Sequence, residues 1–291
     1  MNAYDRLMAL RFPEIEHHYT ARDVILYALG AGYGTDPMDP AQLGFTVETR
    51  LQAAPTMAAV LAYPGFWYRD LDSGLDYQKV VHGSESITLD RVLPVAATVV
   101  AQNRVVGIVD KGPGKGALVT SRREIFEKAS GARLATVTQT AFCRGDGGIG
   151  GPAGAPPPPY PPPHPLPHLL PDREADIACT LPTQPQAALI YRLSGDLNPL
   201  HCDPDTARAA GFPRPILHGL ATFGVVGHAL LKSACGYDPA LLASMECRFS
   251  APVFPGDAVR TEIWRDGRVL SFRAFVGDRL VIANGRATTA D

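Results

Sequence analysis

A segment rich in glycine and proline divides this chain. It covers residues 144–173 and includes Gly145-Asp146-Gly147-Gly148, Pro156–Pro159 and Pro161–Pro163. Proline has a fixed φ and no backbone N–H, so such a run cannot build a helix or a strand ladder. At 291 residues the chain is about twice the usual domain size. We therefore predict two domains, residues 1–143 and 174–291, joined by a linker over residues 144–173. A docking role for the proline run stays open.

Composition favours a folded protein in a reducing compartment. Hydrophobic residues make up 46% of the chain, enough for a sizeable core. The 27 Lys and Arg and the 29 Asp and Glu give a net charge of −2, which argues against a strongly basic nucleic-acid binder and a polybasic membrane anchor. Five scattered cysteines, none in a C-x-x-C pair, make a disulfide framework or a cysteine zinc site unexpected.

The ends of the chain carry no recognisable address. No run of 18 apolar residues is present, so we expect no membrane span. The N-terminal residues Met1–Arg6 do not resemble a signal peptide, and Thr288–Asp291 is not a peroxisomal signal. We expect a cytoplasmic protein.

Three short segments recur in order in the two halves. Ile25–Gly30 aligns with Leu189–Ser194 at an offset of 164. Further on, Val92–Val99 echoes Val253–Arg260, and the strand-like Leu134–Ala141 echoes Leu280–Ala287. A duplicated unit is one explanation; chance similarity of short apolar segments is the other.

The second half predicts one buried helix followed by a strand meander. Gly219–Ala234 is apolar on all sides and, at 16 residues, too short to cross a bilayer, so we expect a helix inside the protein. Asp266-Gly267 and Gly277-Asp278 are turn pairs between apolar runs. The expected strands are Ser244–Ser250, Ala258–Arg265, Val269–Val276 and Leu280–Thr288. Before them we expect a short helix or turn at Gln184–Leu193 and a small helix at Asp205–Ala210. This order predicts an α+β fold with the sheet wrapped round the helix.

Two neighbouring segments carry the chemistry. Asp196 and His201 are five residues apart on a loop that turns at Asn198-Pro199, and a carboxylate and an imidazole that face one point form an acid/base pair. Alternatively, Asp196 and Asn198 cap turns and His201 is a structural histidine. Gly219 lies at the expected start of the apolar helix, where free N–H groups can stabilise an oxyanion. We interpret the adjacent His218 as structural or lining.

The segment Tyr191–His201 (YRLSGDLNPLH), followed by Phe212–Gly224 (FPRPILHGLATFG), resembles the type 2, or (R)-specific, enoyl-CoA hydratases. These are MaoC-like dehydratases of the hot-dog fold, and they include the hydratase part of peroxisomal multifunctional enzyme type 2. The first half shares the resemblance through Tyr27–Gly30, Val81–Glu85 and Val109–Gly114. The resemblance implies a double hot-dog fold, in which two antiparallel sheets are each wrapped round a central helix.

The resemblance also implies roles for individual residues. Asp196 and His201 take the catalytic acid/base positions, Asn198 the position that orients the water or the pair, and Gly219 that of the backbone donor to the thioester carbonyl. In the same way, the residues that match substrate contacts are His82, Gly83, Lys111 and Phe249. For Lys111, a solvated turn lysine is the alternative.

The implied activity is that of a hydro-lyase, hydrating trans-2-enoyl-CoA to (3R)-3-hydroxyacyl-CoA. CoA is part of the substrate, and no cofactor is expected. No metal is expected either, because no carboxylate cluster at ligand spacing accompanies His17-His18, His164 or His168. The alternatives are a dehydratase for a specialised or carrier-bound thioester and a non-catalytic acyl-CoA-binding module.

At an offset of 164, the first half has Gly32, Gly34 and Pro37 in place of the acid/base set, which implies a degenerate copy with room for the acyl tail. The glycines Gly30, Gly32 and Gly34 and the apolar run 58–62 are consistent with such room. We expect one active site per chain, in a monomer of two fused hot dogs or a homodimer.

Overall fold

The computed structural model describes residues 2–150 and 168–290. The helices are α1 (Ala3–Met8), α2 (Ala21–Gly30), α3 (Pro40–Leu43), α4 (Trp67–Asp70), α5 (Ala187–Tyr191), α6 (Pro204–Ala209) and α7 (Gly219–Ala234). The 3₁₀ turns are η1 (Glu48–Arg50), η2 (Pro55–Ala59), η3 (Tyr77–Lys79), η4 (Arg192–Ser194), η5 (Pro199–His201) and η6 (Pro239–Leu241). The strands are β1 (Ile15–Tyr19), β2 (Val80–Leu89), β3 (Ala97–Asp110), β4 (Ala117–Glu127), β5 (Arg133–Cys143), β6 (Ile177–Pro182), β7 (Leu242–Phe249), β8 (Ala258–Asp266), β9 (Val269–Val276) and β10 (Arg279–Thr289).

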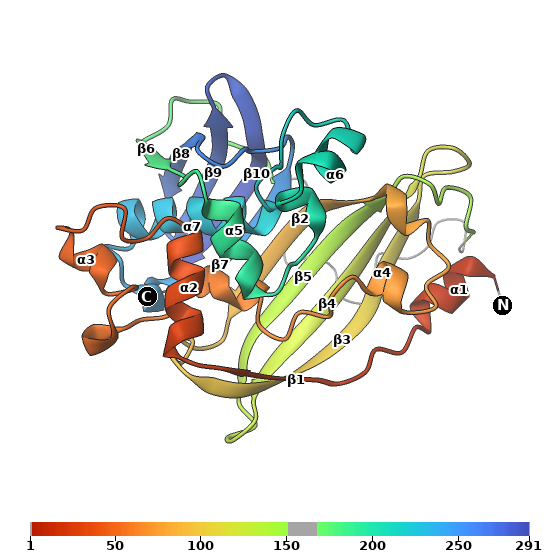
Figure 1. Cartoon of the computed structure of the whole chain (residues 1–291), viewed down its shortest axis with the longest axis horizontal. Helices are drawn as coiled ribbons and strands as arrows, with labels where there is room; N and C mark the ends of the chain where they lie inside the picture. Colours follow the sequence, from red (N-terminus) through yellow and green to blue (C-terminus); the bar gives the residue numbers. More distant parts are fainter. Residues whose placement is uncertain (1, 151–167, 291) are drawn as a thin grey trace.

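The described strands form one antiparallel sheet with an internal repeat (Figure 1). The order is β1-β3-β4-β5-β2 in the first half and, mirrored, β7-β10-β9-β8-β6 in the second. The halves join edge to edge where β2 pairs with β7, with Ile87 opposite Met245. The two sheets we expected are therefore continuous. Pairing the two central edges satisfies backbone groups that would otherwise be exposed.

The repeat segments found in the sequence occupy equivalent places in this sheet. Leu134–Ala141 lies in β5 and Leu280–Ala287 in β10. Each of these strands is the fourth from the outer edge of the sheet in its half. Val92–Val99 and Val253–Arg260 lead into β3 and β8. The structure thus confirms the duplication.

Helix α7 is the central helix of the second half and has the bounds expected from the sequence. Its residues from Leu220 to Leu231 are all buried, so a helix that is apolar on every side is covered on every side. Two of its glycines allow close packing on the first half: a Cβ at Gly227 would lie 2.4 Å from the Thr56 methyl, and one at Gly224 would lie 3.0 Å from the Ala31 Cβ. The four strands expected after α7 are confirmed as β7–β10, within two residues at each end.

The first half departs from the expectation of a second central helix. The offset of 164 places Pro55 where Gly219 begins α7, but only the five-residue turn η2 forms there. Three residues after the end of η2 the backbone of Ala62 takes a left-handed φ of 47°, and Pro64 follows. A left-handed non-glycine residue and a proline are both incompatible with a continuing helix. The apolar run therefore packs against α7 without becoming a helix.

Helices α2 and α5 pack against each other (Figure 1). A Cβ at Gly30 would lie 3.1–3.3 Å from Tyr191, so glycine is needed there for helix contact. Our expectation that Gly30 leaves room for an acyl tail is therefore wrong: Tyr191 fills that space.

The expected linker lies largely outside the described residues, which omit 151–167. Its described beginning is held by Asp110, whose carboxylate accepts hydrogen bonds from the Gly148 and Gly150 N–H groups. At its other end the His168 ring hydrogen-bonds the Ser271 hydroxyl on β9. Within the described part of the chain, no helix is both long and apolar enough to cross a membrane.

Candidate active site

A short loop before η5 brings the predicted acid/base residues together. The Asp196 carboxylate accepts the Asn198 N–H at 3.1 Å, and the Asn198 side-chain oxygen accepts the Leu200 N–H at 3.0 Å. These two Asx turns bend the chain so that His201, the last residue of η5, faces back toward Asp196. The turn-capping role that the sequence left open for Asp196 and Asn198 is thus real. For Asp196 it coexists with a place in the site.

His201 is held as a neutral imidazole with one nitrogen free. Its Nδ1 lies 2.9 Å from the Ile216 carbonyl oxygen, which can only accept, so Nδ1 carries the proton. Nε2 is then the unprotonated nitrogen, and it makes no hydrogen bond within the described residues. Burial lowers the pKa of His201 below its usual 6.5, although the Ile216 carbonyl and the Asp196 charge oppose this shift. The result is a base that is neutral at pH 7.

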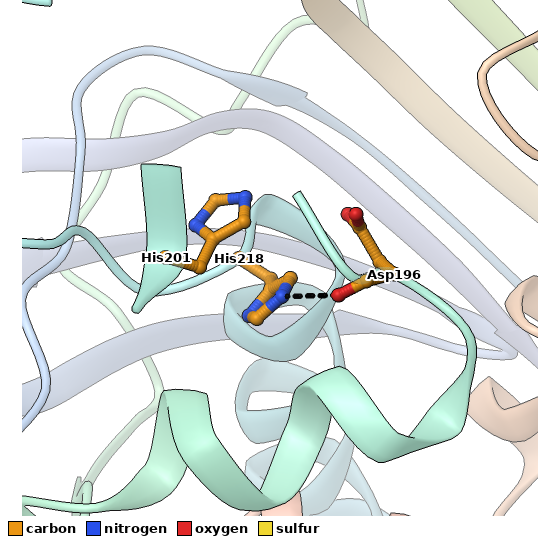
Figure 2. A group of neighbouring side chains, drawn as sticks. All are labelled: Asp196, His201 and His218. Atoms are coloured by element: carbon orange, nitrogen blue, oxygen red, sulfur yellow. Dashed lines mark hydrogen bonds between the residues drawn. The ribbon is translucent and has the colours of Figure 1, made fainter. Parts of the chain in front are cut away.

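The third member of the group is His218, which the sequence assigned only a structural or lining role. Its ring stacks on that of His201, with centroids 3.7 Å apart and planes at 26°. Its Nε2 lies 3.1 Å from the Asp196 backbone oxygen and therefore donates to it (Figure 2). Burial, followed by the neighbouring His201, lowers the pKa of His218 to about 4. The signal in the sequence was its position, next to Gly219 and directly before the apolar helix.

One ligand atom from each of Asp196, His201 and His218 lies within 4.8 Å of the others, a spacing that a metal ion could bridge. The orientation does not fit one. Lone pairs of imidazoles lie in the ring plane, and two stacked rings direct them side by side rather than toward one point. His218 Nε2 is already bonded to the Asp196 backbone oxygen, and its other ring nitrogen points away from the Asp196 carboxylate (Figure 2). The group therefore suits proton transfer better than metal binding.

Predicted residues from both halves meet beside this group. Gly219 is the first residue of α7, where N–H groups have no acceptor within the helix. A Cβ there would lie 3.5 Å from the Phe249 ring, and the Phe249 and His82 rings lie 4.6 Å apart. Glu85, almost fully buried, accepts from His82 Nε2 at 2.9 Å and fixes that ring. Phe249 ends β7 and His82 lies on β2, so the central strand pair of the sheet carries both.

The other two predicted contact residues, Gly83 and Lys111, make contacts within the sheet of the first half. Gly83 lies at an irregularity in the β2–β5 ladder, where a Cβ would approach the Thr140 carbonyl oxygen to 2.9 Å, so glycine is required. Lys111 lies in the β3–β4 turn with its Nζ 4.7 Å from the centre of the Phe142 ring. Phe142 pairs with Val81, the residue before His82. Lys111 thus lies near the strand that carries His82 but makes no contact with the Asp196–His201 pair in the described residues.

A cavity of about 320 Å³ opens beside the loop that carries Asp196 and His201. Its walls include Leu193–Gly195, which lead directly to Asp196, and the chain from Val60 to Tyr63 that follows the truncated helix. Its size is in the range of small-molecule pockets. The charge of Asp196 helps to raise the pKa of Tyr63, after the larger effect of burial, so the cavity lies within electrostatic reach of the site. Of the run 58–62, which the sequence suggested for the tail space, residues 60–62 contribute to this wall.

Models of two domain families match the two halves. Residues 17–145 match the MFE-2 hydratase 2 N-terminal domain, and residues 169–285 match the MaoC like domain. The unmatched residues between them fall inside the proline-rich segment.

Known proteins are similar to this chain over nearly its whole length. The peroxisomal enoyl-CoA hydratase 2 of Arabidopsis thaliana is 37% identical over 290 residues, which covers 94% of this chain and 91% of the relative. A crystal structure of a MaoC-like dehydratase from Phytophthora capsici has a TM-score of 0.85 at 28% identity and covers 99% of each chain. A Mycobacterium tuberculosis protein described as having a double hotdog fold has a TM-score of 0.58 at 16% identity, over 99% of this chain and 98% of that one. The expected double hot-dog fold is thereby confirmed.

Proposed function

Since the chain belongs to the family of MaoC-like enzymes that carry an MFE-2 hydratase 2 N-terminal domain, we propose that it reversibly hydrates trans-2-enoyl-CoA to (3R)-3-hydroxyacyl-CoA. The enzyme class that this reaction gives the chain is hydro-lyase. One observation carries most weight: the unprotonated Nε2 of His201 has no hydrogen-bond partner among the described residues, and it lies next to the Asp196 carboxylate and the free end of α7. A base, a carboxylate and an oxyanion donor are what addition of water to a conjugated thioester requires.

The reaction follows from these positions. His201 Nε2 takes a proton from water as the water oxygen bonds to C3 of the enoyl group. The electron pair of the double bond moves toward the thioester oxygen, where the Gly219 N–H stabilises the negative charge. The Asp196–His201 pair then delivers a proton to C2, so the net change is one water added. Asn198 holds the loop that fixes Asp196, with its side-chain oxygen occupied by the Leu200 N–H; orientation of the water falls to the pair.

The substrate is proposed to lie between the two halves. Phe249 and His82 flank the space in front of Gly219 and suit contact with the thioester end. Gly83 shapes β2 beside them, and Lys111 supplies a positive charge for CoA phosphate or pantetheine oxygens. The cavity beside Leu193–Gly195 takes the acyl tail. CoA is part of the substrate in this scheme, and no further cofactor or metal takes part.

We also propose that each chain has one active site. The first half has Gly32, Gly34 and Pro37 at the positions equivalent to the acid/base set, and it supplies tail and CoA contacts instead. We keep the domain limits of 1–143 and 174–291, a monomer or homodimer of the double hot-dog unit, and a cytoplasmic location as proposals. For the location, a peroxisomal relative makes the peroxisome the competing compartment.

The test is hydration of crotonyl-CoA, followed through loss of the enoyl-thioester absorbance, with chiral analysis of the product. We expect the 3R alcohol. Asp196→Asn is the matched variant, because its amide oxygen still accepts the Asn198 N–H while the carboxylate is lost; we expect kcat to fall by about 10²- to 10⁴-fold. A 3S product, or full activity in Asp196→Asn, would contradict the mechanism. Turnover of carrier-protein thioesters in preference to CoA thioesters would instead support the dehydratase alternative.

A further inference from the structure

The wall of the cavity beside the catalytic loop is not uniformly apolar. Leu26, Met57, Val60 and Leu61 form one part of it, while His17 and Asp23 face the same space. If the cavity takes the acyl tail, as the proposed function requires, a saturated hydrocarbon would cover both polar side chains without replacing their bonds to water. Burying polar groups in this way is unfavourable.

His17 reaches the cavity because of its place on edge strand β1. Alternate residues of this strand, Ile15, His17 and Tyr19, are less exposed than Glu16 and His18 between them, so His17 faces inward. Its Nδ1 accepts the backbone N–H of Ala62 at 2.9 Å. An accepting Nδ1 leaves the proton of the neutral ring on Nε2. Nε2–H is therefore a donor, and it has no acceptor within the described residues.

The bond to Ala62 also explains why His17 is fixed. Ala62 has the left-handed φ of 47° that ends the truncated helix segment, and its N–H would be unpaired without an acceptor. The same contact that stabilises this turn thus locks the tautomer of His17. Burial lowers the pKa of His17, so the ring is neutral at pH 7, although the Asp23 charge opposes the shift.

Asp23 supplies the complementary group. It is in the first turn of α2, where its Oδ2 accepts the Thr20 N–H and the Thr20 hydroxyl, both at 2.8 Å. Its Oδ1 makes no hydrogen bond in the described part of the chain. The cavity wall therefore offers the donor His17 Nε2–H and the acceptor Asp23 Oδ1, beside the polar side chains of Glu16, Tyr63 and Ser194.

We propose that this cavity selects acyl tails that carry a hydroxyl group. A hydroxyl oxygen accepts from His17 Nε2–H, and its proton can be given to Asp23. A ketone could use only the first of these bonds, and a carboxylate would be repelled by Asp23. The substrate class is therefore hydroxylated acyl-CoA, with the hydroxyl far from the thioester.

The test measures binding, so that it does not depend on turnover. Saturated acyl-CoAs of six to twelve carbons are titrated into the enzyme in pairs, with and without a terminal hydroxyl, by calorimetry. One hydrogen bond to a charged partner and one between neutral groups predict a Kd lower by at least about 30-fold for the hydroxylated member at the best chain length. Equal Kd values at every length, or tighter binding of the plain chain, would overturn the proposal.

Three variants assign the effect to His17. In His17→Asn an amide oxygen lies near the Nδ1 position and keeps the Ala62 bond, but the side chain does not reach Nε2. The hydroxyl preference should then fall by about 2- to 10-fold, to the part that the Asp23 bond supplies. His17→Gln reaches the Nε2 position and should keep a larger preference than His17→Asn. His18→Asn, on the exposed side of β1, is the control and should keep the full preference. A hydroxyl preference in His17→Asn as large as that of the unmodified enzyme would also overturn the proposal.

Failure of this inference and failure of the proposed function give different results. Crotonyl-CoA is too short to fill the tail cavity, so its hydration by the unmodified enzyme tests the reaction alone. Hydration of crotonyl-CoA with no hydroxyl preference would remove only the tail inference. Absence of binding by every acyl-CoA would remove both.

Discussion

The imidazole of His201 lies on that of His218 with 3.7 Å between ring centroids. The stack restrains the face of the proposed base, and the Ile216 carbonyl restrains its edge through Nδ1. His218 also donates to the backbone oxygen of Asp196, so one buried side chain positions both members of the acid/base pair. This relationship depends on the turn that leads into α7, which places His218 beneath a loop about 20 residues earlier in the sequence.

We therefore predict that His218 is a positioning residue. His218→Ala should lower kcat by about 10- to 100-fold with a smaller change in KM, because the pair is disordered while the thioester site remains. His218→Gln retains a donor near the Nε2 position for the Asp196 backbone and should recover part of the loss. Steady-state kinetics of the two variants on crotonyl-CoA decides the point. Equal losses in the two variants would show that the hydrogen bond contributes nothing.

Replacement of the proposed base has a sharper expected outcome. His201→Ala should reduce kcat by about 10²- to 10⁴-fold while the Kd for a saturated acyl-CoA changes little. The adjacent Cys202→Ser is the control, because it removes the half-buried thiol beside the site without touching the imidazole. Normal turnover in Cys202→Ser excludes a thiol nucleophile. If Cys202→Ser lost activity and His201→Ala did not, the assignment of the base would be wrong.

Gly219 tests the proposed oxyanion donor without breaking the helix. Its added Cβ would lie 3.5 Å from Phe249, an ordinary contact, so Gly219→Ala should fold with an unchanged or slightly higher Tm. The methyl group occupies the space between the first turn of α7 and Phe249, where the thioester is expected. We predict a loss in kcat/KM of at least about 10-fold, measured together with Tm. Normal kcat/KM in Gly219→Ala would show that the thioester does not bind beside Gly219.

The features that the sequence predicted well depend on contacts close along the chain. Helix α7 is encoded by an apolar run, and the hairpin after β8 by Asp266-Gly267. The Asp196–His201 pair shares one loop, so its members could hardly be far apart. In each case the residues that determine the local geometry lie within one continuous segment.

The features that it predicted poorly depend on contacts between segments. Joining of the sheets through β2 and β7 needs a pairing across about 160 residues, which has no local signature. The missing helix after Pro55 depends on Ala62, whose unusual φ is supported by His17 on another element. His218 was undervalued for the same reason: its partners, Asp196 and His201, are known only from the fold.

A last prediction concerns stability at acid pH. His228 is fully buried in the core, where its ring stacks on Tyr33 with centroids 3.9 Å apart and its Nε2 bonds the Tyr237 hydroxyl. Burial lowers its pKa to about 3, from 6.5 in the unfolded chain. Between these two pH values the unfolded state binds a proton that the folded state does not. The free energy of unfolding must therefore fall as the pH drops below 6.5.

From pH 6.5 to pH 5 this loss is about 2 kcal/mol for His228, and His218, with its pKa of about 4, adds a similar amount. Urea titrations at the two pH values measure it. His228→Phe keeps a ring against Tyr33 and should reduce the pH-dependent loss by about 2 kcal/mol, whatever its effect on stability at pH 7. His18→Asn, an exposed position, should leave the loss unchanged. If His228→Phe and the unmodified protein lost the same free energy, His228 would not be the buried neutral group that the fold indicates.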